Sequence, residues 1–219
     1  MLPIVRDGLL APWVGLVLAY LSGSIPFAYL AGRLKGIDLR TVGSGNLGAT
    51  NVLRTLGWAW AAPVFLLDAL KGFGPAFLLP YFVETQVADR WAIAYGAMAI
   101  AGHAKPIFLL WRGGGKGVAT GAGVFLGLAP LAVLITTSIF AVTVWLTGYV
   151  SLGSLLAAAA LPVAVIGTQG MGSIFVVPSF VIAAFVWWTH RANIGRLRRG
   201  EEHSFKQKRA ASSAPEAPR

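Results

Sequence analysis

The sequence predicts an all-α protein that crosses a membrane about seven times, with its N-terminus outside and its C-terminus in the cytoplasm. Of its 219 residues, 56% are hydrophobic and 12% are charged, and this charged fraction is about half the roughly 25% of a soluble domain. Apolar residues form runs of about 20, the length that crosses a bilayer as a helix. Basic residues gather between these runs, as in the cytoplasmic loops of membrane proteins. A water-soluble enzyme of this length could not bury so much apolar surface, and the same apolar content excludes a disordered chain.

The apolar runs can be assigned in order along the chain. Five clear candidate spans cover residues 9–31, 58–82, 91–111, 152–167 and 174–189. A further run covers 117–147 and as one helix would be about 45 Å long, half as long again as the hydrocarbon core. The basic loop 112–117 and the tail after His190 both belong inside, so an even number of crossings separates them. We therefore expect a turn near 127–130 and two crossings, with a re-entrant first half as the alternative because 117–128 is too short to span alone.

The basic residues indicate orientation. Loop 32–57 carries four of them and belongs inside, whereas loop 83–90 contains Glu84 and Asp89 and suits the outside. The segments rich in Gly, Ser, Asn or charge then converge on the cytoplasmic face, including 149–154 and 189–199. Eight of the 18 basic residues follow the last span, where Arg196, Arg198 and Arg199 are expected to meet anionic lipid headgroups. The net charge of +10 is thus explained without nucleic-acid binding.

Several site types are excluded or disfavoured by composition. The chain contains no Cys, which excludes disulfides and thiol catalysis. No group of His, Asp and Glu has convincing metal-ligand spacing, so no metal or other cofactor is expected. None of the three His residues is followed five residues later by Asp, a pattern of many glycerolipid acyltransferases. No Gly-x-Ser-x-Gly elbow is present, so Ser-His-Asp chemistry is disfavoured.

The first cytoplasmic loop reads GSGNLGATN over residues 43–51. It matches a dinucleotide-binding fingerprint formally, but it follows a transmembrane run and not a buried strand. Its glycines would let backbone N–H groups approach an anion, and a helix starting near Ala49 would direct its positive end to the same place. Arg54 would add a bidentate contact; the alternative is a flexible connector. The expected phosphate contacts in the loop are Gly43, Ser44, Gly45, Asn46, Thr50 and Asn51.

The second cytoplasmic loop reads RGGGKG over residues 112–117. It resembles a P-loop without matching one, since Leu110 occupies the first glycine position and Gly117 stands where Ser or Thr would hold magnesium. Glycines with a Lys at a helix start still predict an anion-binding loop formed by Gly114, Gly115, Lys116 and Gly117. A simple positive-inside anchor would leave the glycines unexplained.

Other polar residues give weaker signals. Ser151 and Ser154 flank the next inner turn, and His190 with Asn193 follows the last span. His190 could act as an acid–base group, a phosphate ligand or a helix cap. Asp68 and Lys71 share one helical face, which predicts a structural pair that borders a polar cavity. His103 is expected to be a hydrogen-bonding interior group.

Short motifs in order along residues 20–202 together resemble the bacterial acyl-phosphate-dependent glycerol-3-phosphate acyltransferase family. They are SGSIPF at 22–27, the loop 43–56, LDALKG at 67–72, GH at 102–103, GKGVAT at 115–120, SLGS at 151–154 and HRANI at 190–194. One departure is the extra glycine in 113–115.

The resemblance implies a seven-helix inner-membrane enzyme with its active site facing the cytoplasm. Such an enzyme transfers a fatty acyl group from acyl phosphate to the sn-1 hydroxyl of glycerol 3-phosphate, giving lysophosphatidic acid and phosphate without an acyl-enzyme. The donor's own phosphate would help to deprotonate the hydroxyl. Membrane lipids and the peripheral enzyme that makes acyl phosphate are the implied partners. The implied polar site contains Ser44, Thr50, Asn51, Arg54, Lys116, Ser151, His190 and Asn193, with Ser44, Arg54, Lys116 and His190 assigned to catalysis.

Residues 1–202 are expected to form one transmembrane acyltransferase domain and 203–219 a basic, disordered cytoplasmic tail. Two other functions fit the composition. A small anion transporter would show an internal repeat and broken helices meeting at the midplane, and no convincing repeat is seen. A lipid-binding scaffold would not need two glycine-rich anion loops.

Overall fold

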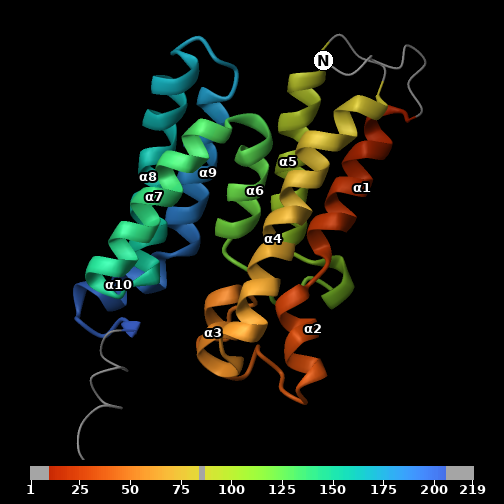
Figure 1. Ribbon diagram of the computed structural model, residues 1–219. Helices are drawn as coiled ribbons and strands as arrows, with labels where there is room; N and C mark the ends of the chain where they lie inside the picture. Colours follow the sequence, from red (N-terminus) through yellow and green to blue (C-terminus); the bar gives the residue numbers. More distant parts are fainter. Residues whose placement is uncertain (1–9, 84–86, 206–219) are drawn as a thin grey trace, which may run out of the picture.

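The computed structural model describes residues 10–83 and 87–205, and within them every regular element is a helix (Figure 1). The predicted all-α class is therefore confirmed for this part of the chain. The elements are α1 (Pro12–Ser24), α2 (Phe27–Leu34), α3 (Ala49–Leu56), α4 (Trp58–Leu78), the 3₁₀ turn η1 (Leu79–Phe82), α5 (Ala88–Ala104), the 3₁₀ turn η2 (Ile107–Leu109), α6 (Val118–Leu128), α7 (Pro130–Thr147), α8 (Val150–Gln169), α9 (Val176–Thr189) and α10 (Arg191–Arg198). Glu84, Arg6 and the tail beyond Phe205 lie outside the described residues.

Among the described residues, five helical stretches are long and apolar enough to cross a bilayer. They are Pro12–Leu34, Trp58–Phe82, Ala88–Leu109, Pro130–Thr147 and Val150–Gln169. Large apolar side chains such as Trp145 and Val177 are more than 70% exposed, as expected for surfaces that face lipid. The helices Val118–Leu128 and Val176–Thr189 are apolar but shorter, so the count of seven crossings stays a prediction.

The first predicted span is broken near the middle. α1 ends at Ser24 and α2 begins at Phe27, because Pro26 cannot donate a helical hydrogen bond and forces Ile25 into an extended conformation. The carbonyl of Ile25 accepts a 2.8 Å hydrogen bond from Lys71 Nζ on α4. The break therefore has a partner that compensates for the lost helical contact.

The third predicted span ends earlier than expected. α5 stops at Ala104, before Pro106, and the residues expected to continue it form η2 and a tight turn. Leu110 and Trp111 adopt left-handed backbone angles, with φ of 50° and 58°. The indole of Trp111 donates to Tyr20 Oη at 2.9 Å, and Tyr20 donates to the carbonyl of Lys105 at 2.8 Å. This turn delivers the chain to the second glycine-rich loop.

The apolar run 117–147 turns where the sequence predicts. α6 ends at Leu128, Ala129 has a non-helical backbone conformation, and α7 starts with Pro130 at its first position. α6 has 11 residues, about 16 Å of helix, which is roughly half of a bilayer core.

Glycines allow two pairs of helices to approach closely. A Cβ on Gly123 of α6 would lie 1.9 Å from the carbonyl oxygen of Ala69 on α4, and one on Gly72 of α4 would lie 2.2 Å from that of Thr120. The α1–α5 contact repeats the arrangement, with Gly23 against the backbone of Ala99. Small residues at such contacts are typical of helix packing in membranes, where backbones meet directly.

The helices form two groups that meet at a seam. α4 packs on α6 and α1 on α5, while α7 packs on α8 and α8 on α9. In Figure 1 the second group stands on one side of α6 and α1, α4 and α5 stand on the other. α2, α3 and α10 lie at the same end of the bundle (Figure 1). The glycine-rich loops and the polar ends of α8 and α9 therefore converge at that end, as expected.

Candidate functional site

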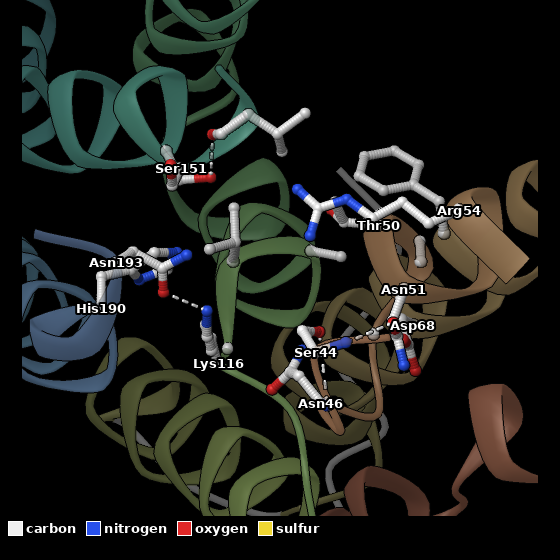
Figure 2. A pocket seen from close by; sticks show the side chains of 18 of the residues that line it. Ser44, Asn46, Thr50, Asn51, Arg54, Asp68, Lys116, Ser151, His190 and Asn193 are labelled. Atoms are coloured by element: carbon white, nitrogen blue, oxygen red, sulfur yellow. Dashed lines mark hydrogen bonds between the residues drawn. The ribbon is translucent and has the colours of Figure 1, made fainter. Parts of the chain in front are cut away.

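A polar pocket lies at the seam, and both helix groups contribute to it (Figure 2). Ser44, Arg54 and Lys116 come from the first group, whereas Ser151 and His190 come from the second. The predicted site residues that line it are Ser44, Asn46, Thr50, Asn51, Arg54, Lys116, Gly117, Ser151, Ser154, His190 and Asn193. Neither group contains the pocket by itself, so its shape depends on how the two groups pack.

The first glycine-rich loop is held by Asn51 at the start of α3. Its side-chain Nδ2 donates to the carbonyls of Leu39 and Val42, both at 3.1 Å, and its Oδ1 accepts from the backbone N–H of Ser44 at 3.0 Å. Asn51 is 1% exposed. All three contacts order the loop. The amide of Asn51 therefore stabilises the loop backbone.

The turn of this loop depends on glycine. Gly43 and Gly45 have φ of 62° and 68°, in the left-handed region. A Cβ on Gly43 would lie 2.2 Å from Asn51 Oδ1 and would displace the amide. Gly43 itself does not line the pocket; its role is to let Asn51 reach the loop.

Arg54 projects from α3 into the pocket (Figure 2). Burial lowers the pKa of its guanidinium, although Glu202 acts in the opposite sense. The group stays a cation at physiological pH because the ordinary pKa of Arg is far higher. The ring of Phe205 lies 5.9 Å from the Arg54 guanidinium carbon, which places the chain after α10 beside the pocket.

The second glycine-rich loop is joined to the first loop and to α5 by backbone hydrogen bonds. Leu47 N donates to the carbonyl of Gly114 at 3.2 Å, and Gly115 N donates to that of His103 at 3.1 Å. A Cβ on Gly115 would lie 2.0 Å from His103 Nε2, so only glycine fits against the buried imidazole. Gly114 and Gly115 border a second, open polar pocket together with Gly45, Lys105 and Arg196.

Lys116 begins a chain of polar contacts that crosses the seam. Its ammonium donates to Asn193 Oδ1 (Figure 2), and Asn193 Nδ2 donates to Glu202 Oε1 at 2.7 Å. Arg196 Nε donates to the other oxygen of Glu202, also at 2.7 Å. Burial lowers the pKa of Lys116 to about 8, with Arg196 and Arg54 adding to the effect against Glu202. The pKa of Lys116 therefore lies close to physiological pH, so a modest rise in pH removes the proton from its ammonium group.

Glu202 was not singled out from the sequence. Burial raises the pKa of this carboxyl, but hydrogen bonds from Asn193 and Arg196 outweigh it, and its pKa lies below the ordinary value. Glu202 is 3% exposed and lines the pocket. No motif marks one of two adjacent Glu residues in a basic tail as a pocket residue. Arg196, which the sequence predicts to lie at lipid headgroups, pairs with this carboxylate, and its contact with lipid stays a prediction.

His190 is neutral at physiological pH. Burial and the nearby charge of Lys116 lower its pKa to about 4. Its Nδ1 lies 2.8 Å from the carbonyl of Val186, and a carbonyl can only accept, so Nδ1 carries the proton. Nε2 is therefore left as a hydrogen-bond acceptor.

Three titratable side chains lie together beside the pocket. Lys71 Nζ lies 2.7 Å from Asp68 Oδ1, which confirms the predicted pair, and His103 Nδ1 lies 3.8 Å from the same oxygen. All three side chains are buried, and Asp68 and His103 line the pocket. The predicted interior position of His103 is confirmed.

An apolar cavity continues from the polar pocket between α6, α7, α8 and α9. Phe65, Gly117, Phe140 and Ser154 line both spaces. Phe65 and Phe140 were not predicted, because an aromatic residue in an apolar run is indistinguishable from a lipid-facing one. The site thus combines cationic and small polar groups at one end with an apolar space at the other.

Comparison with known proteins gives a consistent result. The family model described as glycerol-3-phosphate acyltransferase matches residues 13–200. A protein of that name from Geotalea daltonii is 46% identical over 191 residues, 86% of this chain and 95% of its own. One from Geobacter sulfurreducens is 47% identical over 190 residues, 86% of this chain and 94% of its own.

Two solved structures share the fold. Both are crystal structures of PlsY (YgiH), an integral membrane glycerol 3-phosphate acyltransferase. The glycerol 3-phosphate form superposes with a TM-score of 0.82 at 36% identity, and the lysophosphatidic acid form with 0.79 at 35%. Each comparison covers 89% of this chain and 95% of the other.

Proposed function

The chain belongs to the glycerol-3-phosphate acyltransferase family, which includes integral membrane enzymes, and from that premise we propose that its acyl donor is an acyl phosphate. The reaction is transfer of a fatty acyl group to the sn-1 hydroxyl of glycerol 3-phosphate, yielding lysophosphatidic acid and inorganic phosphate. The observation that carries the proposal is the continuity of the cationic pocket with the apolar cavity, across Gly117, Phe140 and Ser154. A donor with a phosphate next to its carbonyl and a long apolar chain matches both ends of this space.

The transfer balances without a covalent enzyme intermediate. The sn-1 oxygen attacks the donor carbonyl, a new ester C–O bond forms, and the bond between the carbonyl carbon and the phosphate oxygen breaks. The hydroxyl proton leaves with the phosphate, whose own oxygen accepts it during the attack. The chain has no thiol, and positioning with charge neutralisation supplies the catalysis.

The cationic residues act on the phosphates. Arg54 is a permanent cation with a forked donor geometry suited to phosphate. Lys116 adds a second positive charge, and the adjacent Gly117 and Gly115 let backbone N–H groups come close to an anion. The developing negative charge on the leaving phosphate is stabilised by these groups.

The neutral polar residues orient the acceptor. His190 Nε2, Ser44, Thr50 and Ser151 can exchange hydrogen bonds with glycerol hydroxyls or phosphate oxygens. Asn193 fixes the Lys116 ammonium, and Asn51 with Gly43 fixes the loop that carries Ser44. Remaining backbone contacts come from the glycine-rich loops, at Gly45, Asn46 and Gly114.

We further propose that the enzyme crosses the inner membrane seven times, with its N-terminus outside. The basic loops and α10 then face the cytoplasm, where soluble glycerol 3-phosphate is available and an enzyme that makes acyl phosphate would act. Residues 1–202 form the catalytic domain in this proposal and 203–219 the tail. Because the chain has no Cys, single Lys35→Cys and Ser173→Cys variants can be labelled in intact cells. Labelling of Lys35→Cys by an impermeant maleimide would contradict this orientation.

The deciding experiment uses the purified full chain with palmitoyl phosphate and glycerol 3-phosphate. Release of inorganic phosphate and formation of lysophosphatidic acid are measured together, and palmitoyl-coenzyme A serves as the alternative donor. We expect equimolar products with the acyl phosphate only. Turnover with the coenzyme A ester but none with acyl phosphate would overturn the donor assignment.

A further inference from the structure

The apolar cavity extends away from the polar pocket for about two helical turns. Gly117 and Ser154 border both spaces and mark the near end. Phe125 lies eight residues beyond Gly117 in the sequence, which corresponds to about 12 Å along a helix. Leu161 on α8 lies seven residues after Ser154, and Val133 lies seven residues before Phe140 on α7, which runs in the opposite direction. The three helices therefore bring these three residues to the same depth.

Small side chains line the level between these two ends. They are Gly121 and Ala122 on α6, Ala157 and Ala158 on α8, and Ala183 on α9. Ile182 is larger and lies against Gly121, where an added Cβ would come within 3.3 Å of Ile182 Cγ1. Thr136 on α7 donates its hydroxyl hydrogen to the carbonyl of Val133 at 3.2 Å, so its polar hydrogen is used within the helix. Thr137, the next residue of α7, also lines the cavity. This level is therefore apolar apart from two threonine hydroxyls.

The far end is closed by larger side chains. Phe125 is 2% exposed, and Val133 and Leu161 are each 9% exposed. All three belong to one hydrophobic cluster that continues into Leu128 and Val165. Protein interiors of this kind are densely packed, and inserting a methylene forces side chains to move. The cavity therefore has a firm end.

We infer that Phe125, Val133 and Leu161 set the acyl-chain length that the enzyme prefers. The occupant is the donor's acyl chain, because the cavity is continuous with the reacting pocket and apolar side chains make up most of its lining. This inference rests on the proposed function, which places the acyl group in the cavity. A chain that reaches these side chains gains apolar contact with every methylene, whereas a longer one must displace the packed cluster.

The test compares donors of different length on matched variants. Ala158→Leu fills the small-residue level, and we expect the ratio of kcat/KM for palmitoyl phosphate to that for octanoyl phosphate to fall by about tenfold or more. Leu161→Ala opens the far end, and the ratio of kcat/KM for lauroyl phosphate to that for decanoyl phosphate should rise several-fold. Ala159→Leu adds the same side chain at the next residue of α8, which is exposed on the outer surface, and both ratios should stay at the wild-type value.

Unchanged ratios in Ala158→Leu and Leu161→Ala, with turnover retained, would overturn the inference. Uniform loss of activity together with a lower Tm would show that a variant is misfolded, and Ala158→Val then serves as the milder substitution. Equal discrimination by Ala158→Val and wild type would also count against the inference.

Product binding separates this inference from the donor assignment. Lysophosphatidic acids from octanoyl to stearoyl are titrated into each variant, with intrinsic tryptophan fluorescence as the readout and no donor present. Ala158→Leu should weaken binding of the long-chain products and spare the octanoyl product. If wild type uses no acyl phosphate, the donor assignment fails, while the chain-length dependence of product binding still decides this inference.

Discussion

Asn193 Nδ2 donates a 2.7 Å hydrogen bond to Glu202 Oε1, and this contact ties α10 to the segment that follows it. The other amide atom of Asn193 accepts from Lys116. Glu202 thereby fixes the orientation of the amide, since its carboxylate can only accept and Lys116 can only donate. A residue outside the predicted site thus controls the position of the Lys116 ammonium.

Replacing Glu202 tests this arrangement. Glu202→Gln presents an amide to Asn193 and Arg196, so at least one donor faces another donor. We expect kcat/KM to fall by about tenfold, or about 1.4 kcal/mol, and Tm to fall with it. The control is Glu201→Gln, because Glu201 is exposed and pairs with the exposed Arg199, and exposed pairs contribute about 0–1 kcal/mol. Equal behaviour of the two variants would contradict a positioning role for Glu202.

Deprotonation of Lys116 should lower the activity at alkaline pH. Its pKa of about 8 means that the ammonium is charged below that pH and neutral above it. Phosphate binding requires the charged form, so kcat/KM should decline as pH rises through about 8. Steady-state rates across neutral and alkaline pH measure this decline. Lys116→Arg keeps its charge and should remove the alkaline decline even if its maximum rate is lower; the same decline in this variant would assign it to another group.

Arg54 should contribute to substrate affinity through its charge. Arg54→Ala removes hydrogen bonds to a charged phosphate, each of about 1.5–3 kcal/mol, so kcat/KM should fall by at least about tenfold. Initial rates with each substrate varied in turn will show which phosphate depends on Arg54. Arg33→Ala is the matched control, since Arg33 is exposed over Tyr29 and lies outside both polar pockets. Normal kinetics of Arg54→Ala would refute its assignment.

The close approach of α4 and α6 should require Gly123. An added methyl would lie 1.9 Å from the carbonyl oxygen of Ala69, and such overpacking costs about 1–3 kcal/mol. Gly123→Ala should therefore lower Tm in detergent. Gly74→Ala on α4 meets no atom within 4 Å and should leave Tm unchanged or raise it. Similar melting of both variants would mean that the interface can relax.

The sequence predicts the general architecture because membrane helices obey local rules. Composition and backbone chemistry predict the apolar runs. They also predict the start of α7 at Pro130 and the start of α3 at Ala49. The positions of Pro26 and Pro106 shorten two predicted helices, and that effect depends on a single residue within a longer apolar run. Helix boundaries are therefore less predictable than the presence of the helices.

The candidate site was predictable where residues occur in a local pattern. Gly-rich loops with Ser44, Arg54 and Lys116 are typical of phosphate binding, and the structure places these side chains around one pocket. Asn51 shows the limit of such reasoning. Its place in the glycine-rich loop suggests contact with an anion. In the structure its side-chain amide instead makes hydrogen bonds to the backbone of Leu39, Val42 and Ser44.

The sequence by itself determined the membrane environment, the family and the residue types that gather at one end of the bundle. Each follows from composition or from short motifs, which carry their information within a few residues. Only the tertiary structure decided that Glu202 reaches Asn193, that His103 borders the pocket, and that an apolar cavity ends at Phe125 and Leu161. The pocket and the cavity bring together residues from helices far apart in the chain, and the Asn193–Glu202 contact depends on how the chain turns after α10. Neither arrangement is written in a local sequence pattern.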